Sequence, residues 1–283
     1  MKRVCFVNDS WSPESANPFS DDGKYGNEWS ALIYDNSIPC PSNDFYTGQL
    51  YTMAVPLIAD QSFQYLRDFV NYEIEHQRNV IIKIPQPLRN IAKGTLQKNL
   101  ITDLVPQPRP SDPKWLVHST LPENWRQIKQ MGALRSPAIL KKRFSLDIEQ
   151  LHMAPLEPED YGDYIMLDTL DGKSELVVAS RRAGHICTDP DAPYLPGVRL
   201  YIKAHRLITE GHGVRDGVHP LKVKSSLSVK RYVRLAVTPD LLPKREIWTP
   251  NSFAEASDNF FLMMTKHRGP HKIPVLSRNI SDE

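Results

Sequence analysis

Cysteine and long apolar runs are scarce in this sequence. Its three cysteines, Cys5, Cys40 and Cys187, form no CxxC pair, so neither a disulfide framework nor a zinc site of the common spacing is expected. The apolar stretch near the N-terminus is too short for a signal peptide, and no window approaches the length of a membrane span. We therefore expect a cytoplasmic protein that does not enter a membrane.

Well-known catalytic motifs are absent too. The chain contains no GxxxxGK phosphate loop, no GxGxxG after a strand, no HExxH and no GxSxG. His205, His212 and His219 recur every seven residues, which on a helix separates successive side chains by about two turns, roughly 10 Å, and so does not form a set of ligands to one metal ion. The segment around them is also rich in glycine, and we expect no metal site.

Prolines outnumber glycines, 24 to 13, in a chain with 40% hydrophobic and 24% charged residues. This composition is typical of a globular protein with a real core, and the fixed φ of proline predicts short elements joined by stiff loops. Four prolines fall in the eleven residues Val105–Trp115. This stretch predicts a boundary between domains at 1–110 and 111–283, and a long surface loop within one domain is the alternative.

Charge is unevenly distributed, although the net charge is only +2. Residues 1–50 carry three basic and seven acidic side chains, whereas residues 197–250 carry eleven basic and four acidic ones. A basic segment of this kind is typical of proteins that bind phosphate groups or nucleic acid. An ordinary solvated surface of lysine and arginine explains it equally well.

The pattern of residues 1–110 predicts a smaller N-terminal α/β region. Its first 50 residues favour loops and short strands over helix. Apolar residues at three- and four-residue steps predict a helix over about Ile58–His76. A strand is expected at Val80–Ile84, and a second helix over about Pro87–Leu104.

The pattern of residues 111–283 predicts an α+β domain. A short strand at Leu116–His118 precedes a helix with capping-box spacing from Thr120 to Glu123, and Gly132 is expected to end this helix. Asp-Gly turns are expected at Asp171–Gly172 and Asp216–Gly217. Further strands are expected at Tyr161–Leu170, Glu175–Ser180, Gly197–Ala204 and Tyr232–Thr238.

Arginine, histidine and small turn residues gather in three parts of the C-terminal half. These are Ser180–His185, Gly211–His219 and the strand that carries His118. Guanidinium groups beside flexible backbone suit a pyrophosphate or a nucleic-acid phosphate, because arginine donates two hydrogen bonds at once. Each residue taken singly also has an ordinary structural explanation, such as a core histidine or a surface charge.

Two segments resemble proteins of the ADP-ribosyltransferase fold. Val117–Leu134 is similar to their opening strand and helix, in which an H-x-T on the first strand precedes a helix that ends at glycine. Gly197–Leu227 resembles the later half of the RNA 2'-phosphotransferase branch. The resemblance covers about residues 115–240 and implies a split antiparallel β-sheet with flanking helices and the use of NAD. Nothing in residues 1–110 matches the N-terminal lobe of that branch.

The resemblance also implies roles for residues of the first strand and of a later loop. His118 would hold the adenosine side of NAD, and Ser119 and Thr120 would complete the same wall. Arg215 matches the family arginine ahead of Gly-Val and would bind a phosphate in a catalytic role, facing His118 across a groove.

Further residues are implied by the same resemblance. Arg181 and Arg182 would bind cofactor phosphate, and His185 beside them would act catalytically. Pro243–Pro250 resembles the last strand of mono-ADP-ribosyltransferases, where a glutamate stabilises an oxocarbenium-like transition state. Glu246 would take this role, although Lys244 stands where the family often has a second polar or acidic residue. An exposed glutamate on an edge strand is the alternative.

The expected function is NAD-dependent ADP-ribosyl transfer to a nucleic-acid acceptor, RNA or DNA, or to another phosphate-rich acceptor. The alternative is a non-catalytic nucleic-acid or protein-binding module on a degenerate transferase fold. A third hypothesis is that residues 1–110 inhibit or target the C-terminal domain, because the two carry opposite charge.

Overall fold

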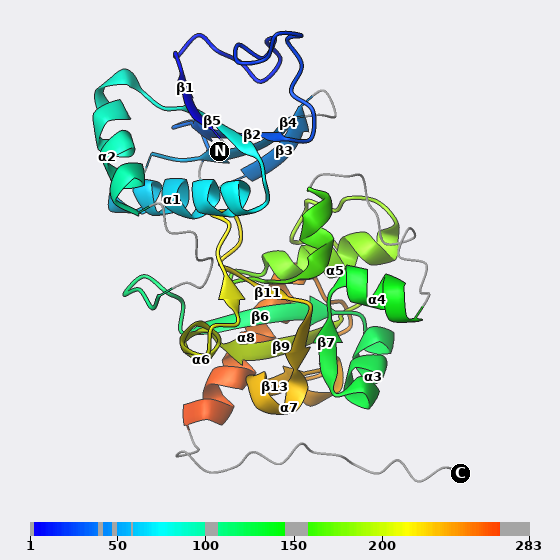
Figure 1. Ribbon diagram of the computed structural model, residues 1–283. Helices are drawn as coiled ribbons and strands as arrows, with labels where there is room; N and C mark the ends of the chain where they lie inside the picture. The colour runs from blue at the N-terminus through cyan, green and yellow to red at the C-terminus, as the bar shows by residue number, and fades with distance from the viewer. Residues whose placement is uncertain are drawn as a thin grey trace.

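The computed structural model describes residues 3–38, 42–46, 50–57, 59–99, 107–144 and 158–266. The chain is a mixed α+β protein with two lobes, and the connection of residues 215–220 reaches upward from the second lobe to the first (Figure 1). We call residues 3–99 the N-terminal lobe and residues 115–266 the C-terminal lobe.

The N-terminal lobe is built on a five-stranded sheet in the order β1-β5-β2-β4-β3. Only β3 runs antiparallel to its neighbour β4. The strands are β1 (Val4–Val7), β2 (Trp29–Tyr34), β3 (Ser42–Tyr46), β4 (Leu50–Val55) and β5 (Asn79–Lys83). The helices are α1 (Ala59–Glu75), η1 (Gln86–Leu88) and α2 (Arg89–Asn99).

Each face of this sheet is covered differently. Apolar residues of α1 and α2 cover one face, and the long loop between β1 and β2 covers the other with Trp11 and Tyr25. The predicted first helix and the strand at Val80–Ile84 are confirmed to within a residue or two. The second predicted helix begins with η1 and continues as α2, and its expected end at Leu104 lies outside the described residues.

The C-terminal lobe contains three small antiparallel sheets, with the orders β13-β9-β6, β10-β11-β8 and β12-β7. The strands are β6 (Trp115–Thr120), β7 (Ala133–Arg135), β8 (Tyr164–Leu167), β9 (Val198–Lys203), β10 (Gly213–Val214), β11 (Leu221–Lys224), β12 (Ser226–Ser228) and β13 (Val233–Val237). The helices are α3 (Pro122–Met131), α4 (Pro137–Phe144), η3 (Glu159–Asp163), α5 (Lys173–Ala183), α6 (Ala204–Thr209), α7 (Val229–Tyr232), η4 (Pro239–Leu241) and α8 (Pro250–Lys266).

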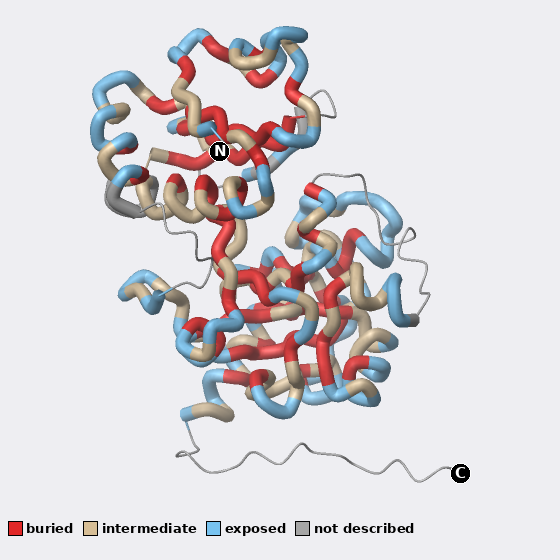
Figure 2. The backbone as a smooth tube through the Cα atoms, viewed as in Figure 1, coloured by how far each residue is buried: buried red, intermediate tan, exposed pale blue. Residues whose placement is uncertain are grey.

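One isolated bridge joins two of these sheets. Val117 of β6 and Asp168, directly after β8, exchange both backbone hydrogen bonds, at 2.8 and 2.9 Å. Elsewhere in the described ranges β6 pairs with β9, and β8 pairs with β11. The two sheets are therefore separate apart from this one bridge. The buried residues follow these strands and the connection between the lobes (Figure 2).

Three local predictions for this lobe were wrong. Glu175–Ser180 lies in helix α5 and not in a strand, because its glutamate, valine and alanine side chains pack as one helical face against β6 and α8. Thr120 ends β6 as a buried strand residue, and Leu121 is the N-cap of α3 without a side-chain cap. Pro243–Pro250 is irregular apart from one bridge between Trp248 and Tyr194. Gly132 ends α3 at φ 68° as predicted.

The lobes share a hydrophobic cluster. Tyr161 and Tyr164 of the C-terminal lobe are buried among residues of α1 and the first sheet. The β10–β11 connection also packs closely on α1, since a Cβ added at Gly217 would lie 2.9 Å from the carbonyl oxygen of Tyr65. Gly217 has φ 82°, so this approach needs glycine for two reasons.

A buried ammonium group lies at the centre of the interface between the lobes. Nζ of Lys222 is 2.8 Å from Oδ2 of Asp216, and both side chains are fully buried. The same ammonium lies 3.5 Å from the ring centroid of Tyr161 and 3.7 Å from that of Tyr72. Burial acts to raise the pKa of Asp216, but Lys222 and His219 lower it well below its usual range. The charge of Lys222 is thus balanced by one carboxylate and several ring faces.

Further polar contacts surround this ammonium. Tyr72 donates to Asp160 at 2.5 Å, and Arg78 donates to the same carboxylate at 2.6 Å. The hydroxyls of Tyr51 and Tyr161 lie 3.1 Å apart. Each contact joins one lobe to the other, so the interface is specified by directional bonds as well as by apolar area.

We expect Asp216→Asn to lower the free energy of unfolding by about 3–5 kcal/mol, because it leaves the Lys222 ammonium buried without a carboxylate. Urea denaturation followed by circular dichroism measures this loss. The double variant Asp216→Asn/Lys222→Met serves as the matched control and should regain part of the loss, since methionine fills the aromatic site without a charge. A double variant no more stable than Asp216→Asn would contradict the assignment.

Candidate functional site

The imidazole of His118 lies where the two sheets separate. Its Nδ1 is 3.1 Å from the carbonyl oxygen of Met166 in β8. The Val117–Asp168 bridge sets an antiparallel register in which Ser119 would be the next residue to bond Met166. The histidine ring takes this place, so a side chain and not a backbone amide satisfies the Met166 carbonyl. His118 thus acts as a wedge between β6 and β8.

The separation leaves part of β6 unpaired. Backbone groups of Val117 point to β8, and those of Ser119 point to the same edge because alternate residues share an edge in an antiparallel strand. Among the described residues, none bonds the amide or the carbonyl of Ser119 on this edge. One donor and one acceptor therefore lie side by side next to His118.

His118 is kept uncharged by its surroundings. Burial lowers its pKa to about 4, and the positive charge of Arg181 acts in the same direction against the Met166 bond. With Nδ1–H donated to Met166, the other ring nitrogen, Nε2, is a hydrogen-bond acceptor. It has no bonding partner in the described part of the chain.

The side chain of Ser119 has a different environment from its backbone. It points to the opposite face of β6 from His118, where its hydroxyl donates to Glu175 and lies 2.9 Å from that of Ser174. Arg199 of β9 is fully buried there and pairs with Glu175 at 3.2 Å and with Asp258 at 2.9 Å. Burial raises the pKa of Glu175, and Arg199 opposes this. This network packs on the face of β6 opposite His118 and holds the Ser119 backbone in position.

Thr120 is buried at the end of β6 and packs closely on the segment before β9. A Cβ added at Gly197 would lie 2.4 Å from the Thr120 carbonyl oxygen. The two chains can therefore approach only because residue 197 is glycine. Thr120 and His118 share a face of the strand, as alternating side chains must.

The basic residues predicted near the site lie at the end of α5. Arg181 is exposed and close enough to His118 to lower its pKa. Arg182 lies 4.0 Å from Glu123 of α3. His185 is exposed after the helix, with Nδ1 3.2 Å from the Ala183 carbonyl and Nε2 3.9 Å from the Cys187 sulfur. The structure thus brings His118 and Arg181 together and places His185 in the loop beyond.

Arg215 does not face His118 across a groove. Three strand spacings separate β6 from β10, roughly 14 Å. The buried guanidinium of Arg215 pairs with Asp112 and donates to the Gln107 carbonyl at 3.1 Å. Nearby, Arg109 binds Asp68 of α1 through two bonds of 2.6 Å. Arg215 fastens the β10–β11 connection to the proline-rich segment, and its charge is neutralised there.

Glu246 is exposed in the irregular segment between η4 and α8. The predicted strand that would carry it is absent from the described structure at this position, because only Trp248 pairs, in a single bridge with Tyr194. No contact links Glu246 to His118 among the described residues.

The basic segment 197–250 is not one surface. Arg199, Arg215 and Lys222 are buried and paired with carboxylates. Only the remaining basic side chains of this segment are available to an external partner. The charge count from the sequence therefore overestimates the positive charge on its surface.

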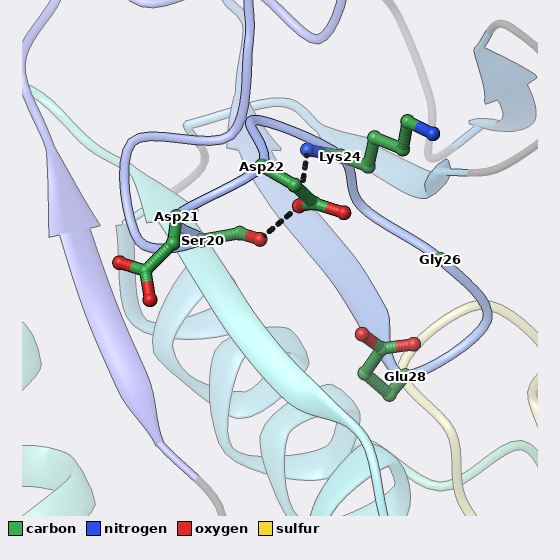
Figure 3. A pocket seen from close by; sticks show the side chains of 6 residues that line it. All are labelled: Ser20, Asp21, Asp22, Lys24, Gly26 and Glu28. Atoms are coloured by element: carbon green, nitrogen blue, oxygen red, sulfur yellow. Dashed lines mark hydrogen bonds between the residues drawn. The ribbon is translucent and has the colours of Figure 1, made fainter.

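An acidic hollow lies on the N-terminal lobe, away from this site (Figure 3). Asp22 accepts bonds from the Ser20 hydroxyl and, at 3.0 Å, from the Lys24 amide. These bonds close a local loop and leave Asp21 and Glu28 on its sides. In the described ranges, no group of three or more His, Cys, Asp or Glu could hold a metal ion, and no helix is long and apolar enough to cross a membrane.

No family model, curated protein or solved structure matches this chain. The assignment of a function therefore rests on the geometry of its own residues.

Some residues of the site were missed by the sequence interpretation. Met166 contributes its backbone carbonyl, and every residue has such a group, so the residue type gives no indication of this contact. Glu175 and Arg199 were placed in strands without a role, although a charged residue inside an apolar run such as VRLYI is itself a signal of a buried partner.

His118 should remain neutral down to about pH 4, whereas an ordinary histidine side chain has a pKa near 6.5. In the unfolded chain the His118 ring becomes protonated near pH 6.5, but in the folded protein only near pH 4. Between these two pH values, protonation of this ring therefore favours the unfolded state. We expect this residue to make the free energy of unfolding fall by up to about 3 kcal/mol over that range. NMR titration of the ring signals measures the pKa directly, and His118→Gln should show a flatter stability profile. A ring titrating near 6.5 would contradict the burial argument.

Proposed function

We propose that the C-terminal lobe binds NAD where β6 and β8 separate and transfers ADP-ribose to a phosphate-rich acceptor. The observation that carries this proposal is the unpaired Ser119 edge beside the neutral His118. Two antiparallel sheets that meet at one bridge, with helices around them, support it, because the sequence resemblance implies an antiparallel arrangement of this kind.

The Ser119 backbone is complementary to a carboxamide. Its amide donates to a carbonyl oxygen, and its carbonyl accepts from an NH2 group, so the two together match the substituent of the nicotinamide ring. A carboxylate in the same place has no hydrogen-bond donor for the Ser119 carbonyl and would set two acceptor oxygens against each other. The site thus selects the amide over the acid.

His118 and Arg181 suit the rest of a dinucleotide. An imidazole that accepts through Nε2 binds a ribose hydroxyl, and a low pKa keeps this acceptor available throughout the neutral range. The exposed Arg181 provides positive charge beside it for pyrophosphate oxygens. Thr120 lies on the same face of β6 and completes the wall that holds the ligand.

In such a transfer the bond between nicotinamide and ribose breaks, nicotinamide leaves with the bonding electrons, and an acceptor atom bonds to the ribose carbon as it loses a proton. The chain's part is to orient the two ends of NAD through His118 and Ser119. Glu246 and Arg215 are not part of this proposal. Glu246 is exposed and makes no contact with His118 in the described structure, and Arg215 is already paired with Asp112.

NAD should bind at least about 10-fold more tightly than its nicotinic acid analogue, because only the amide satisfies both backbone groups of Ser119. Isothermal titration calorimetry measures both affinities. His118→Ala should weaken NAD binding about 10-fold or more, with Arg215→Met as the control variant that keeps the wild-type affinity. Equal affinity for the amide and the acid, or an unaffected His118→Ala, would refute the binding mode.

Transfer itself is tested with NAD labelled on the adenylate phosphate. Incubation with RNA, DNA and protein acceptors should move the label to one of them and release nicotinamide. A non-catalytic binding module would leave the label on NAD even where calorimetry shows binding, and that result would overturn the transferase proposal.

A further inference from the structure

One face of the C-terminal lobe is strongly basic. It is formed by residues 122–144, which build α3, β7 and α4, and by residues 226–234, which build β12 and α7. The two segments contain nine lysines and arginines and a single acidic residue, Glu123. We call this surface the α3–α4–α7 face.

The two segments form one surface because they are bonded side by side. Strands β7 and β12 pair from Ser226–Arg135 to Ser228–Ala133. The amide of Val229 also donates to the carbonyl of Gly132, at 2.9 Å, which fixes the start of α7 against the end of α3 (Figure 1). Helix η3, which contacts α4 and carries Glu159 and Asp163, bounds the face on that side.

The cations of this face differ from those buried elsewhere in the lobe. Arg199, Arg215 and Lys222 are buried and paired with carboxylates. On the face, the exposed Arg231 pairs with Glu210 at 3.0 Å. The other exposed cations of the face have no ion-pair partner in the described structure. These exposed cations are Arg126, Lys129, Lys141, Lys142, Arg143 and Lys230. Their mutual repulsion is relieved only by counterions or by an anionic partner.

The face also lacks the features of other docking surfaces. The exposed large hydrophobic side chains of the described chain lie outside α3, α4 and α7. Insertion at a membrane surface and a stable protein interface both need apolar or aromatic side chains that become buried. Positive charge without such side chains matches a partner that offers a row of phosphates.

We propose that the α3–α4–α7 face binds the phosphodiester backbone of a nucleic acid. Helix α3 begins directly after β6, the strand that carries His118 and Thr120, so the face adjoins the candidate site in the chain. A shallow hollow on α3 is lined by Arg126, Lys129 and Gln130. The role of this nucleic acid as the acceptor rests on the proposed function, whereas binding to the face does not.

The test uses the full chain without NAD and a fluorescein-labelled RNA or DNA of about 20 nucleotides, single-stranded or duplex. Fluorescence anisotropy should give a Kd of about 1–100 μM that weakens steeply from about 50 to 200 mM salt. Lys141→Gln/Lys142→Gln/Arg143→Gln should bind at least about 10-fold more weakly at low salt, with a salt slope smaller by about two to three.

The control is Arg3→Gln/Lys24→Gln/Lys93→Gln, which removes the same charge from exposed positions of the N-terminal lobe and should keep the wild-type Kd and slope. Equal losses in both triple variants, the absence of binding, or binding to phosphatidylserine vesicles but not to nucleic acid would each overturn the proposal. Circular dichroism and NAD calorimetry on the variants show that fold and NAD site are intact. Wild-type protein that binds nucleic acid but not NAD would support the face and refute the transferase function.

Discussion

The contact between the Lys222 ammonium, the Asp216 carboxylate and the surrounding tyrosine rings determines how the rest of the molecule is arranged. A buried ammonium is unstable without a carboxylate and a polarisable surround, so the sheet that carries Lys222 must lie against α1. That sheet includes β8, and β8 provides both the bridge to β6 and the carbonyl that His118 binds. The geometry of the candidate site thus depends on an interaction in the interface between the lobes.

This dependence changes the meaning of the N-terminal lobe. The sequence predicted residues 1–110 as a separate region, and one hypothesis was that this region inhibits or targets the remainder. In the structure they cover Tyr161 and Tyr164, and the Gly217 connection fits against α1. Removing them would expose a hydrophobic cluster of the C-terminal lobe, so loss of activity in a truncated chain would not distinguish regulation from unfolding.

The sequence predicted best the elements whose pattern alone determines them. The α1 periodicity, the β5 run and the strand at β9 needed no partner to be recognised, and the Gly132 helix end follows from local backbone chemistry. The helix α5 was taken for a strand because Leu-Val-Val favours either structure and tertiary packing decides between them. From the sequence, Arg215 and Lys222 counted toward a basic surface. The carboxylate partner of Arg215 is distant in the sequence, and no motif identifies Asp216 as the partner of Lys222. The unpaired edge at Ser119 could not be predicted for a different reason. It depends on the point at which β6 and β8 stop pairing, and no residue type marks that point.

The His118 wedge has a consequence for how the opening persists. Strand edges with free amides and carbonyls tend to close on the nearest complementary edge, and β8 provides one a single step beyond the bridge. The imidazole takes the Met166 carbonyl as its partner and so stands where that closure would occur. The unpaired edge of β6 is therefore maintained by one imidazole ring. A smaller residue at position 118 would let β6 and β8 continue to pair at Ser119 and Met166.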